Sequence, residues 1–226
     1  MKRVVVPELL DTDAGTPREV AASIQDLRMF NRWFGGIRTM SSLLRRVAQQ
    51  RGLKELSWVD VAGSEGYVAT LTQQSLARSG TTVRPVILDR APTHLGELHP
   101  GICGDALSLP FRDNSFDAVG SSLFLHHLEP EQIVRFVREG LRVARHAFLI
   151  HDLRRHPLHL ALSYLGLPLY RSRITRHDAP ASVRRAYTAE EIAKILEPVA
   201  AASDIEIRKF YLFRMGAIVW KQPNMT

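Results

Sequence analysis

The chain has 226 residues, of which 45% are hydrophobic and 23% are charged. This composition is typical of a globular protein that can bury a core. The single cysteine, Cys103, excludes a disulfide framework and a cysteine-based zinc site, and it suits a reducing compartment such as the cytoplasm. The N-terminal segment MKRVVVPELLDTD has too short an apolar run for a secretory signal or a membrane span.

The net charge is +7, from 30 lysines and arginines against 23 acidic residues. A basic protein can bind nucleic acid, a membrane surface or a small anion, and scattered arginines can also form a plain solvated surface. The densest stretches, 138–156 and 171–185, do not interleave arginines with stacking aromatic residues, as single-strand binders do. We therefore expect a small-molecule substrate, compatible with an anionic or phenolic group, and no nucleic acid.

The first expected elements are two helices. Thr16, Pro17 and Glu19 form a capping-box signal for a helix that the segment NRWFGG (31–36) ends. An apolar stripe over 40–47 predicts a second amphipathic helix.

From residue 55 onward, strand and helix patterns alternate. Strand signals cover 55–61, 82–89, 115–125 and 146–153, with a very short strand and a turn within 102–111. Helix signals cover 68–76, 130–141 and the segment that a second capping box, Thr188 with Glu191, opens. The last two strands, 204–213 and 214–221, are expected to form an antiparallel pair at a sheet edge.

This alternation predicts one α/β domain with a mainly parallel, doubly wound sheet. We divide the chain 1–226 into a helical cap (1–54), a cofactor-binding core (55–154), an irregular lid segment (155–187) and a C-terminal helix with a strand pair (188–226). Ligands of such sheets bind beyond the carboxyl ends of the strands.

Small and acidic residues follow three strands in turn. The first strand ends in Asp60 and a turn that contains Gly63 and Gly66, where the backbone can approach a ligand closely. Asp89 ends the second strand and suits a grip on a ribose diol, and Asp105 follows in a turn. Each residue alone also fits a tight turn, a helix cap or an Asx-turn. Their order on successive strand ends favours a nucleotide-like cofactor.

The string GDALSLPFRDNSFDAVGSSLFLHHL (104–128) resembles the UbiE and type-11 branch of the class I S-adenosylmethionine-dependent methyltransferases. PELLDTDAGTP, HDLRRHPLHL and ITRHDAPASVRRAYT are similar to a bacterial subgroup that is linked with polyketide or quinone-like small molecules. The resemblance covers nearly the whole chain. It implies a Rossmann-like fold with seven strands.

The resemblance also implies the cofactor, S-adenosylmethionine, and its contacts. The residues that it assigns to the methionine end, the ribose and the adenine are Asp60, Ala62, Gly63, Gly66, Asp89, Arg90, Asp105, Ala106 and Leu123. The family's loop has glycines where this chain has Ala62 and Ser64. Alanine fits such a loop unless the backbone requires a positive φ, so this difference bears on cofactor affinity more than on the fold.

His126 and His127 follow the fourth strand, where the transferred methyl group is expected. A histidine with a pKa of about 6.5 can take the proton of a hydroxyl acceptor, although the pair can equally stabilise the turn that follows. Asp152 is expected to orient the base. The expected substrate contacts are His151, Arg154, Arg176 and His177. We expect no metal site, because no other histidine pair has ligand spacing and methyl transfer needs no metal.

We therefore expect a small-molecule methyltransferase, a monomer or a homodimer, with oxygen favoured as the acceptor. The alternatives are carbon methylation of a quinone-like ring, RNA methylation and a non-catalytic relative. A short-chain dehydrogenase is excluded, because no tyrosine has a lysine four residues later.

Overall fold

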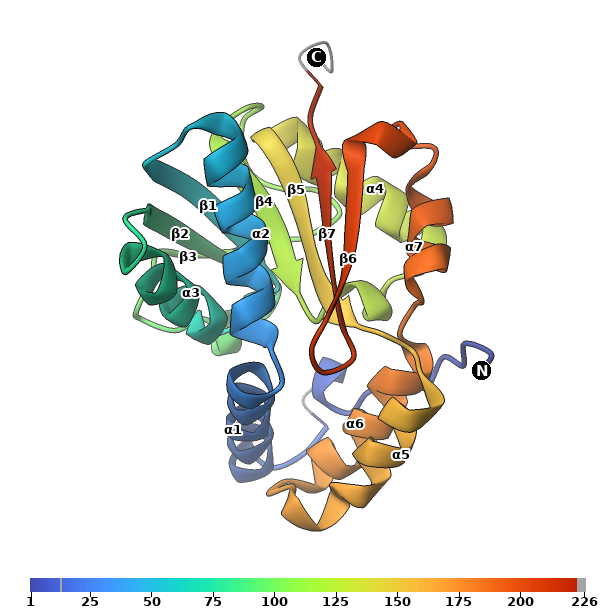
Figure 1. Cartoon of the computed structure of the whole chain (residues 1–226). Coiled ribbons are helices and arrows are strands. Elements are labelled where there is room, and N and C mark those ends of the chain that lie inside the picture. The colour runs from blue at the N-terminus through green and yellow to red at the C-terminus, as the bar shows by residue number, and fades with distance from the viewer. Residues whose placement is uncertain (13, 223–226) are drawn as a thin grey trace.

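The computed structural model describes residues 1–12 and 14–222, and its centre is a sheet in the order β3-β2-β1-β4-β5-β7-β6 (Figure 1). Strands β1 to β5 are parallel, and β7 runs antiparallel to both β5 and β6. The predicted fold, a mostly parallel seven-stranded sheet with an antiparallel C-terminal pair, is confirmed. The strands are β1 (Glu55–Val61), β2 (Thr82–Asp89), β3 (Gly101–Cys103), β4 (Phe116–Ser122), β5 (Ala144–Leu153), β6 (Ile205–Phe210) and β7 (Arg214–Trp220).

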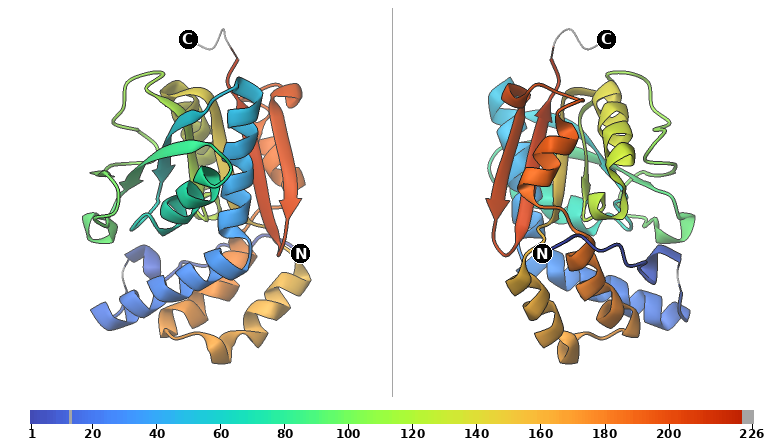
Figure 2. Two further views of the ribbon diagram at one scale, coloured as in Figure 1. Left: turned by 60° about the vertical axis from the view of Figure 1, so that its left-hand side comes forward. Right: turned by 90° about the vertical axis from the view of Figure 1, so that its right-hand side faces the viewer.

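Helices cover both faces of the sheet (Figures 1 and 2). On one face α2 and α3 enclose a core with Leu56 and Trp58, and on the other α4 and α7 enclose a core with Val59 and Val61. The side chains of β1 thus alternate between two apolar layers, as expected for a buried parallel strand. The helices are α1 (Pro17–Trp33), α2 (Gly36–Arg51), α3 (Tyr67–Ala77), α4 (Pro130–Val143), α5 (Pro157–Leu165), α6 (Arg173–Arg185) and α7 (Ala189–Leu196).

Local signals explain several helix starts. The capping boxes of Thr16 with Glu19 and of Thr188 with Glu191 form as predicted, at the starts of α1 and α7. A third box, Glu129 with Gln132, starts α4 next to Pro130. Within the described residues, no helix is long and apolar enough to cross a membrane.

A group of helices, α1, α5 and α6, lies beyond the carboxyl ends of the parallel strands (Figures 1 and 2). Two expectations differ from this arrangement. Helix α2, expected in the cap, packs on the sheet instead, because Met40 and Leu44 are buried in the core with Leu149. The segment 155–187, expected to be irregular, contains α5 and α6, and α6 continues through Pro180.

Buried polar contacts join the cap helices. The Asp26 carboxylate of α1 accepts hydrogen bonds from the backbone amides of Arg171 and Ser172, at 2.9 and 3.3 Å. The Ser172 hydroxyl donates to the carbonyl of Glu19 at 2.8 Å. Satisfied buried hydrogen bonds of this kind fix the two helices relative to one another.

Residues 1–12, which we call the N-terminal strap, run between the cap and the sheet. The Asp178 carboxylate of α6 accepts from the amides of Leu9 and Leu10, at 2.8 and 3.0 Å. The Val4 amide donates to the carbonyl of Arg184 at 3.1 Å. Arg3 pairs with Glu129 at 2.9 Å. The strap therefore connects the end of α6 to the region that follows β4.

Candidate active site

The loop after β1 has the backbone conformation of a glycine-rich loop, although two of its positions are not glycine. Ala62 and Ser64 have φ values of 56° and 51°, and Gly66 has 77°. Left-handed backbone strains a residue with a Cβ atom by about 1–2 kcal/mol. The sequence did not decide whether this loop needs a positive φ, and the structure has one at both Ala62 and Ser64.

The two retained glycines lie where no side chain fits. A Cβ atom on Gly63 would lie 2.9 Å from the carbonyl oxygen of Asp60 and 3.0 Å from the side chain of Ile87. Gly66 has its positive φ directly before α3 begins at Tyr67. The loop thus packs closely onto the ends of β1 and β2.

Asp60 is fully buried at the end of β1, and neither oxygen of its carboxylate has a hydrogen-bond partner within residues 1–12 and 14–222. Burial raises the pKa of Asp60 to about 8, and the nearby Asp89 carboxylate contributes to the rise. Gly120 of β4 is the register partner of Asp60, and a Cβ atom on Gly120 would lie 2.7 Å from the carbonyl oxygen of Leu149. An unpaired buried carboxylate is costly, and a bound cationic group would satisfy it.

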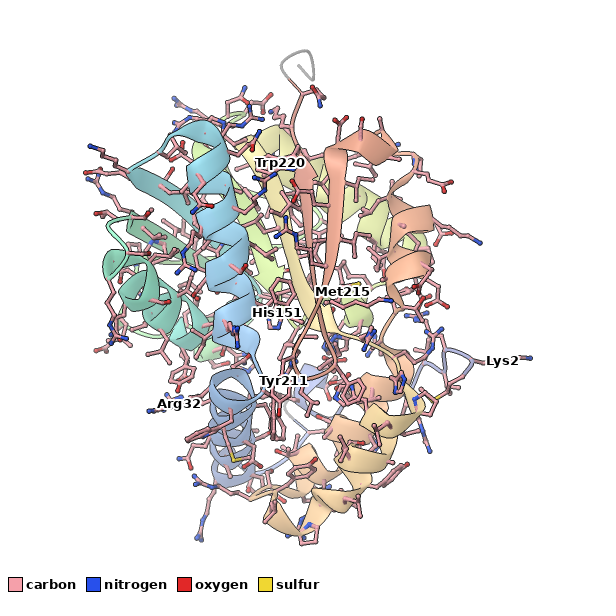
Figure 3. All side chains as sticks on the ribbon, in the orientation of Figure 1. Lys2, Arg32, His151, Tyr211, Met215 and Trp220 are labelled. Atoms are coloured by element: carbon pink, nitrogen blue, oxygen red, sulfur yellow. The ribbon has the colours of Figure 1, made fainter. Side chains whose placement is uncertain are left out.

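Two more unpaired polar side chains lie on the same face of the sheet. Ser122 and His151 are register partners at the ends of β4 and β5, two positions beyond Gly120 and Leu149. The Ser122 hydroxyl and both ring nitrogens of His151 have no hydrogen-bond partner in the part of the chain that the structure describes. His151 lies between the sheet and the cap (Figure 3). The sequence predicted His151 as a substrate contact and missed Ser122. The signal for Ser122 is its place two residues after Gly120, which puts both on the same face of β4.

Burial lowers the pKa of His151 to about 3, and the positive charge of Arg214 acts in the same direction. The imidazole is therefore neutral at pH 7. Asp60, Ser122 and His151 together offer charge and hydrogen-bonding capacity that no described residue uses. These residues suit S-adenosylmethionine, which carries a positive ammonium group and ribose hydroxyls.

Asp89 lies beside this group and fixes the loop. Its carboxylate accepts from the amide of Ser64 at 2.9 Å and from that of Ala91 at 3.0 Å. Each carboxylate oxygen has a further lone pair for a ribose hydroxyl. The side chain of Arg90 is exposed, and its carbonyl accepts a hydrogen bond from Cys103.

The expected adenine contacts follow β3. Asp105 is exposed, and its carboxylate accepts from the amide of Leu107 at 2.8 Å, which is the Asx-turn that the sequence also allowed. Ala106 is buried. Leu123, expected to line the cofactor, has a φ of 58°, and its amide donates to the carbonyl of His151 at 2.8 Å.

His126 is buried between two carboxylates. Its Nδ1 lies 2.7 Å from Oδ1 of Asp152, and its Nε2 lies 3.5 Å from Oε1 of Glu8. Burial alone lowers the pKa of His126, but Asp152 and Glu8 outweigh it and raise the pKa to about 10. A protonated imidazole cannot accept a proton, so this geometry disfavours the expected role of His126 as a base. Asp152 orients it, because its other oxygen accepts from the His126 amide at 2.9 Å.

His127 has the more open position of the two. Its side chain is 19% exposed, and its ring stacks on Phe124 with the centroids 6.2 Å apart. Nδ1 lies 2.9 Å from a carboxylate oxygen of Asp11, and Nε2 lies 3.9 Å from Oε2 of Glu8. His127 is therefore the better candidate for proton transfer.

Glu8 and Asp11 were not among the residues predicted for the site. Both belong to the N-terminal strap, and Glu8 is buried against the histidines. Their only sequence signal is the acidic pattern of PELLDTD, which does not indicate its partners more than a hundred positions away.

The expected substrate contacts other than His151 lie apart from this cluster. Arg176 and His177 are exposed on α6, and His177 pairs with Asp178 at 2.8 Å. The Arg154 guanidinium lies 5.8 Å from the ring centre of Phe213. The structure therefore does not enclose Arg176 and His177, because both side chains are exposed.

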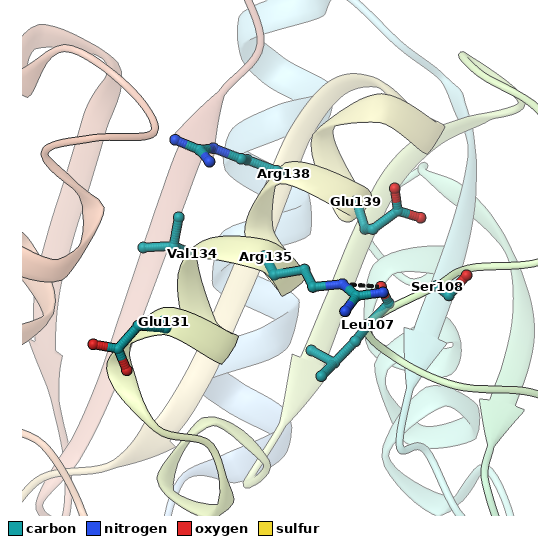
Figure 4. A pocket seen from close by; sticks show the side chains of 7 residues that line it. All are labelled: Leu107, Ser108, Glu131, Val134, Arg135, Arg138 and Glu139. Atoms are coloured by element: carbon teal, nitrogen blue, oxygen red, sulfur yellow. Dashed lines mark hydrogen bonds between the residues drawn. The ribbon is translucent and has the colours of Figure 1, made fainter.

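A surface hollow beside α4 is separate from the strand ends (Figure 4). Arg135 crosses it and donates to the carbonyl of Leu107 at 2.9 Å. Its lining contains none of the expected site residues and consists of Leu107, Ser108, Glu131, Val134, Arg135, Arg138 and Glu139.

Several solved structures share this fold. The plantazolicin methyltransferase BpumL, solved with a triazolic desmethylPZN analog and SAH, is 12% identical, with 95% of each chain covered and a TM-score of 0.65. The magnesium protoporphyrin IX methyltransferase of Synechocystis PCC 6803, solved with bound SAH, is 14% identical, with 83% of this chain and 84% of that chain covered and a TM-score of 0.53. A SAM dependent methyltransferase from Aquifex aeolicus is 16% identical, with 79% and 89% covered and a TM-score of 0.50.

A comparison with curated proteins found no match. Residues 59–147, however, match the family model of a methyltransferase domain. This segment runs from the end of β1 into β5 and contains Asp60, Asp89 and the two histidines. The matched segment thus lies within a fold that solved S-adenosylmethionine-dependent methyltransferases share.

Proposed function

We propose that the protein methylates an oxygen atom of a small, aromatic or polyketide-like molecule that binds between the strand ends and the cap. The observation that carries the proposal is the set of unpaired buried polar atoms on Asp60, Ser122 and His151, next to Asp89. These atoms face one side of the sheet at neighbouring strand ends, where the cofactor of a doubly wound sheet binds. We also propose that the protein belongs to the UbiE-like bacterial subgroup that acts on such small molecules.

In the proposed complex, Asp60 pairs with the ammonium group of the cofactor and Asp89 accepts from the ribose. Ala62, Gly63 and Gly66 form the loop around the methionine end, and Asp105 with Ala106 lies at the adenine. When bound, S-adenosylmethionine supplies a methyl group on a positively charged sulfur, which needs no further activation. The protein then contributes alignment, which is worth several kcal/mol in such reactions.

The acceptor side centres on His127. His126 is held by Asp152 and Glu8, whereas His127 keeps an exposed edge and a carboxylate neighbour, Asp11. An imidazole that a carboxylate orients suits the removal of a hydroxyl proton. Oxygen is favoured over carbon as the acceptor for this reason.

The cap favours a small substrate. The ion pair between Arg28 of α1 and Glu65 of the loop joins the cap to the cofactor loop. The names of two fold neighbours refer to small molecules, plantazolicin and magnesium protoporphyrin IX, which agrees with this substrate class. We place the enzyme, as a monomer or a homodimer, in the cytoplasm because its one cysteine, Cys103, is free and exposed.

Calorimetry with S-adenosylmethionine tests the cofactor assignment. The intact protein is expected to bind one equivalent, and Asp89→Ala is expected to bind at least tenfold more weakly. Asp113→Ala, which removes an exposed aspartate outside the site, is the control and should bind as the intact protein does. No binding by the intact protein would refute the enzyme assignment.

Comparison of His127→Gln with His126→Gln tests the acceptor side. Turnover with a panel of phenolic and polyketide acceptors should fall at least a hundredfold in His127→Gln, while cofactor affinity stays the same. Equal turnover in His127→Gln and the intact protein would remove His127 from the chemistry.

A further inference from the structure

Three potential metal donors meet under the N-terminal strap. A carboxylate oxygen of Glu8 and one ring nitrogen each of His126 and His127 lie within 4.8 Å of one another. Glu8 comes from the strap and the histidines from the short helix η3 (Leu125–His127), so the fold alone brings them together. Imidazole nitrogen with a carboxylate oxygen is a donor set that suits zinc and related divalent metals.

The arrangement of the two rings is the first specific observation. Both histidines direct Nε2 toward the Glu8 carboxylate, at 3.5 Å for His126 and 3.9 Å for His127. Donors bound to one zinc ion at about 2.0–2.1 Å lie roughly 3.3 Å apart in a tetrahedron. The two distances in this chain end on different oxygens, Oε1 and Oε2, and the three donors lie within 4.8 Å of one another, so the side chains would have to close by up to about 1.5 Å around an ion.

The second observation concerns the opposite nitrogens. Nδ1 of His126 lies 2.7 Å from Asp152, and Nδ1 of His127 lies 2.9 Å from Asp11. Histidine ligands in metal sites nearly always give their second nitrogen to a carboxylate or carbonyl, which fixes the tautomer and the ring. His126 has this support as a hydrogen bond, whereas His127 has Asp11 at ion-pair distance only, with no hydrogen bond to Nδ1 among the described residues.

The third observation is the state of Glu8. Its side chain is 8% exposed, and Oε1 has no hydrogen-bond partner among the described residues. It points at the two histidines from the side opposite to Asp152. A buried carboxylate is unfavourable unless a cation completes it. Protonated His126 is that cation in the metal-free protein, and a metal ion would replace its Nε2 proton.

We propose that Glu8, His126 and His127 bind one divalent transition-metal ion, of the zinc type, under the N-terminal strap. Three protein ligands leave a fourth position open, as in catalytic zinc sites. The site itself does not depend on the proposed function. Its role does: if the protein methylates a hydroxyl acceptor, the open position suits the acceptor oxygen, whose pKa the metal would lower. In the metal-bound state His127 is then a ligand, and the hydroxyl proton leaves to solvent.

Metal titration of the full-length protein tests the site. Protein stripped with a chelator is titrated with Zn²⁺ by calorimetry and with Co²⁺ by visible absorption, and bound zinc is counted by elemental analysis. One zinc per chain is expected, with the absorption of four-coordinate cobalt. Glu8→Gln and His127→Gln should lose this site, and Asp11→Asn should bind about 10- to 100-fold more weakly.

His146→Gln is the matched control. His146 is a partly exposed histidine near a carboxylate, 3.8 Å from Asp117, and it lies outside the cluster. This variant should bind zinc as the intact protein does. Thermal unfolding monitored by circular dichroism confirms that each variant is folded. Folded Glu8→Gln that binds zinc as tightly as His146→Gln would overturn the proposal, as would intact protein that takes up no stoichiometric zinc.

Calorimetry with S-adenosylmethionine on the same samples separates the two proposals. Cofactor binding without zinc binding overturns the metal site alone. Zinc binding without cofactor binding supports the metal site and refutes the proposed methyl transfer.

Discussion

The carboxylate of Asp89 accepts a hydrogen bond from the backbone amide of Ser64 at 2.9 Å, so the end of β2 holds the loop that follows β1. Ser64 has a positive φ in this position. The residue expected to grip the ribose thus also holds the strained part of the cofactor loop. Cofactor affinity and loop conformation are coupled through this one carboxylate.

The first prediction concerns the strain in this loop. Ala62→Gly and Ser64→Gly should each raise the free energy of unfolding by about 0.5–1 kcal/mol. Relief of left-handed strain gives about 1–2 kcal/mol, and the greater freedom of glycine in the unfolded chain removes about half of this. Urea unfolding measures the change. Ala21→Gly, at an exposed position within helix α1, is the control and should destabilise by a similar amount. Destabilisation in all three variants would show that the loop is not strained.

The second prediction concerns Asp60 and pH. Its pKa of about 8 in the free protein means that the folded state holds a proton that the unfolded state loses near pH 4. The contribution of this group to stability therefore decreases as pH rises from about 4 to 8. A positive ammonium group binds the ionised form, so cofactor binding should release close to one proton at pH 6–7. Calorimetry in buffers of different ionisation enthalpy counts this proton.

Cofactor binding to Asp60→Asn should release no proton. Binding to Asp105→Asn, whose substitution lies in an exposed turn, should release as many protons as binding to the intact protein. Affinity of the intact protein should rise with pH, by up to tenfold per unit, and level off near pH 8. A flat affinity profile between pH 6 and 8 would contradict the pairing of Asp60 with the cofactor.

The third prediction concerns Ser122, whose buried hydroxyl has no hydrogen-bond partner among the described residues. Ser122→Ala should stabilise the cofactor-free protein by about 1 kcal/mol, because an unsatisfied buried group is removed, and it should weaken cofactor binding. The control is Ser163→Ala, whose hydroxyl donates to the carbonyl of Leu160 at 2.7 Å. That variant should lose about 1 kcal/mol. Chemical unfolding measures the stability of both variants, and calorimetry measures their affinity for the cofactor. A Ser122→Ala variant that is less stable than the intact protein and binds the cofactor equally well would contradict a cofactor contact at Ser122.

The fourth prediction concerns the N-terminal strap. Asp178→Ala removes the acceptor of the Leu9 and Leu10 amides, so hydrogen exchange of residues 8–11 should become at least tenfold faster. Turnover should fall, because Glu8 and Asp11 leave the histidines, while cofactor affinity stays the same. Glu129→Gln, which weakens the exposed pair with Arg3, is the milder control. Unchanged exchange in Asp178→Ala would mean that other contacts hold the strap.

Elements with local signals could be predicted from the sequence. The capping boxes at Thr16 and Thr188 and the apolar strands 55–61 and 82–89 lie where the pattern indicated them. Helix α6 could not be recognised, because arginines and an internal Pro180 hide its apolar face. Helix α2 was recognised but placed in the cap, since an amphipathic pattern does not say which partner covers it.

The candidate site was predictable only along the strand ends. Asp60, Asp89 and His151 follow strands that their composition identifies. The positive φ of Ala62 and Ser64 could not be inferred, because both residue types avoid it in most contexts. Glu8 could not be linked to His126, since no local pattern indicates a contact between residues so far apart in the chain.

The contact between the strap and α6 joins residues 169 positions apart, Leu9 and Asp178. During synthesis the strap leaves the ribosome first, whereas its anchor on α6 follows only after β1 to β5 have been made. The histidine cluster therefore gains Glu8 and Asp11 late, after most of the sheet can already have formed. A chain stopped before α6 would carry the cofactor loop and both histidines but would lack the α6 contacts that hold Glu8 and Asp11 in place.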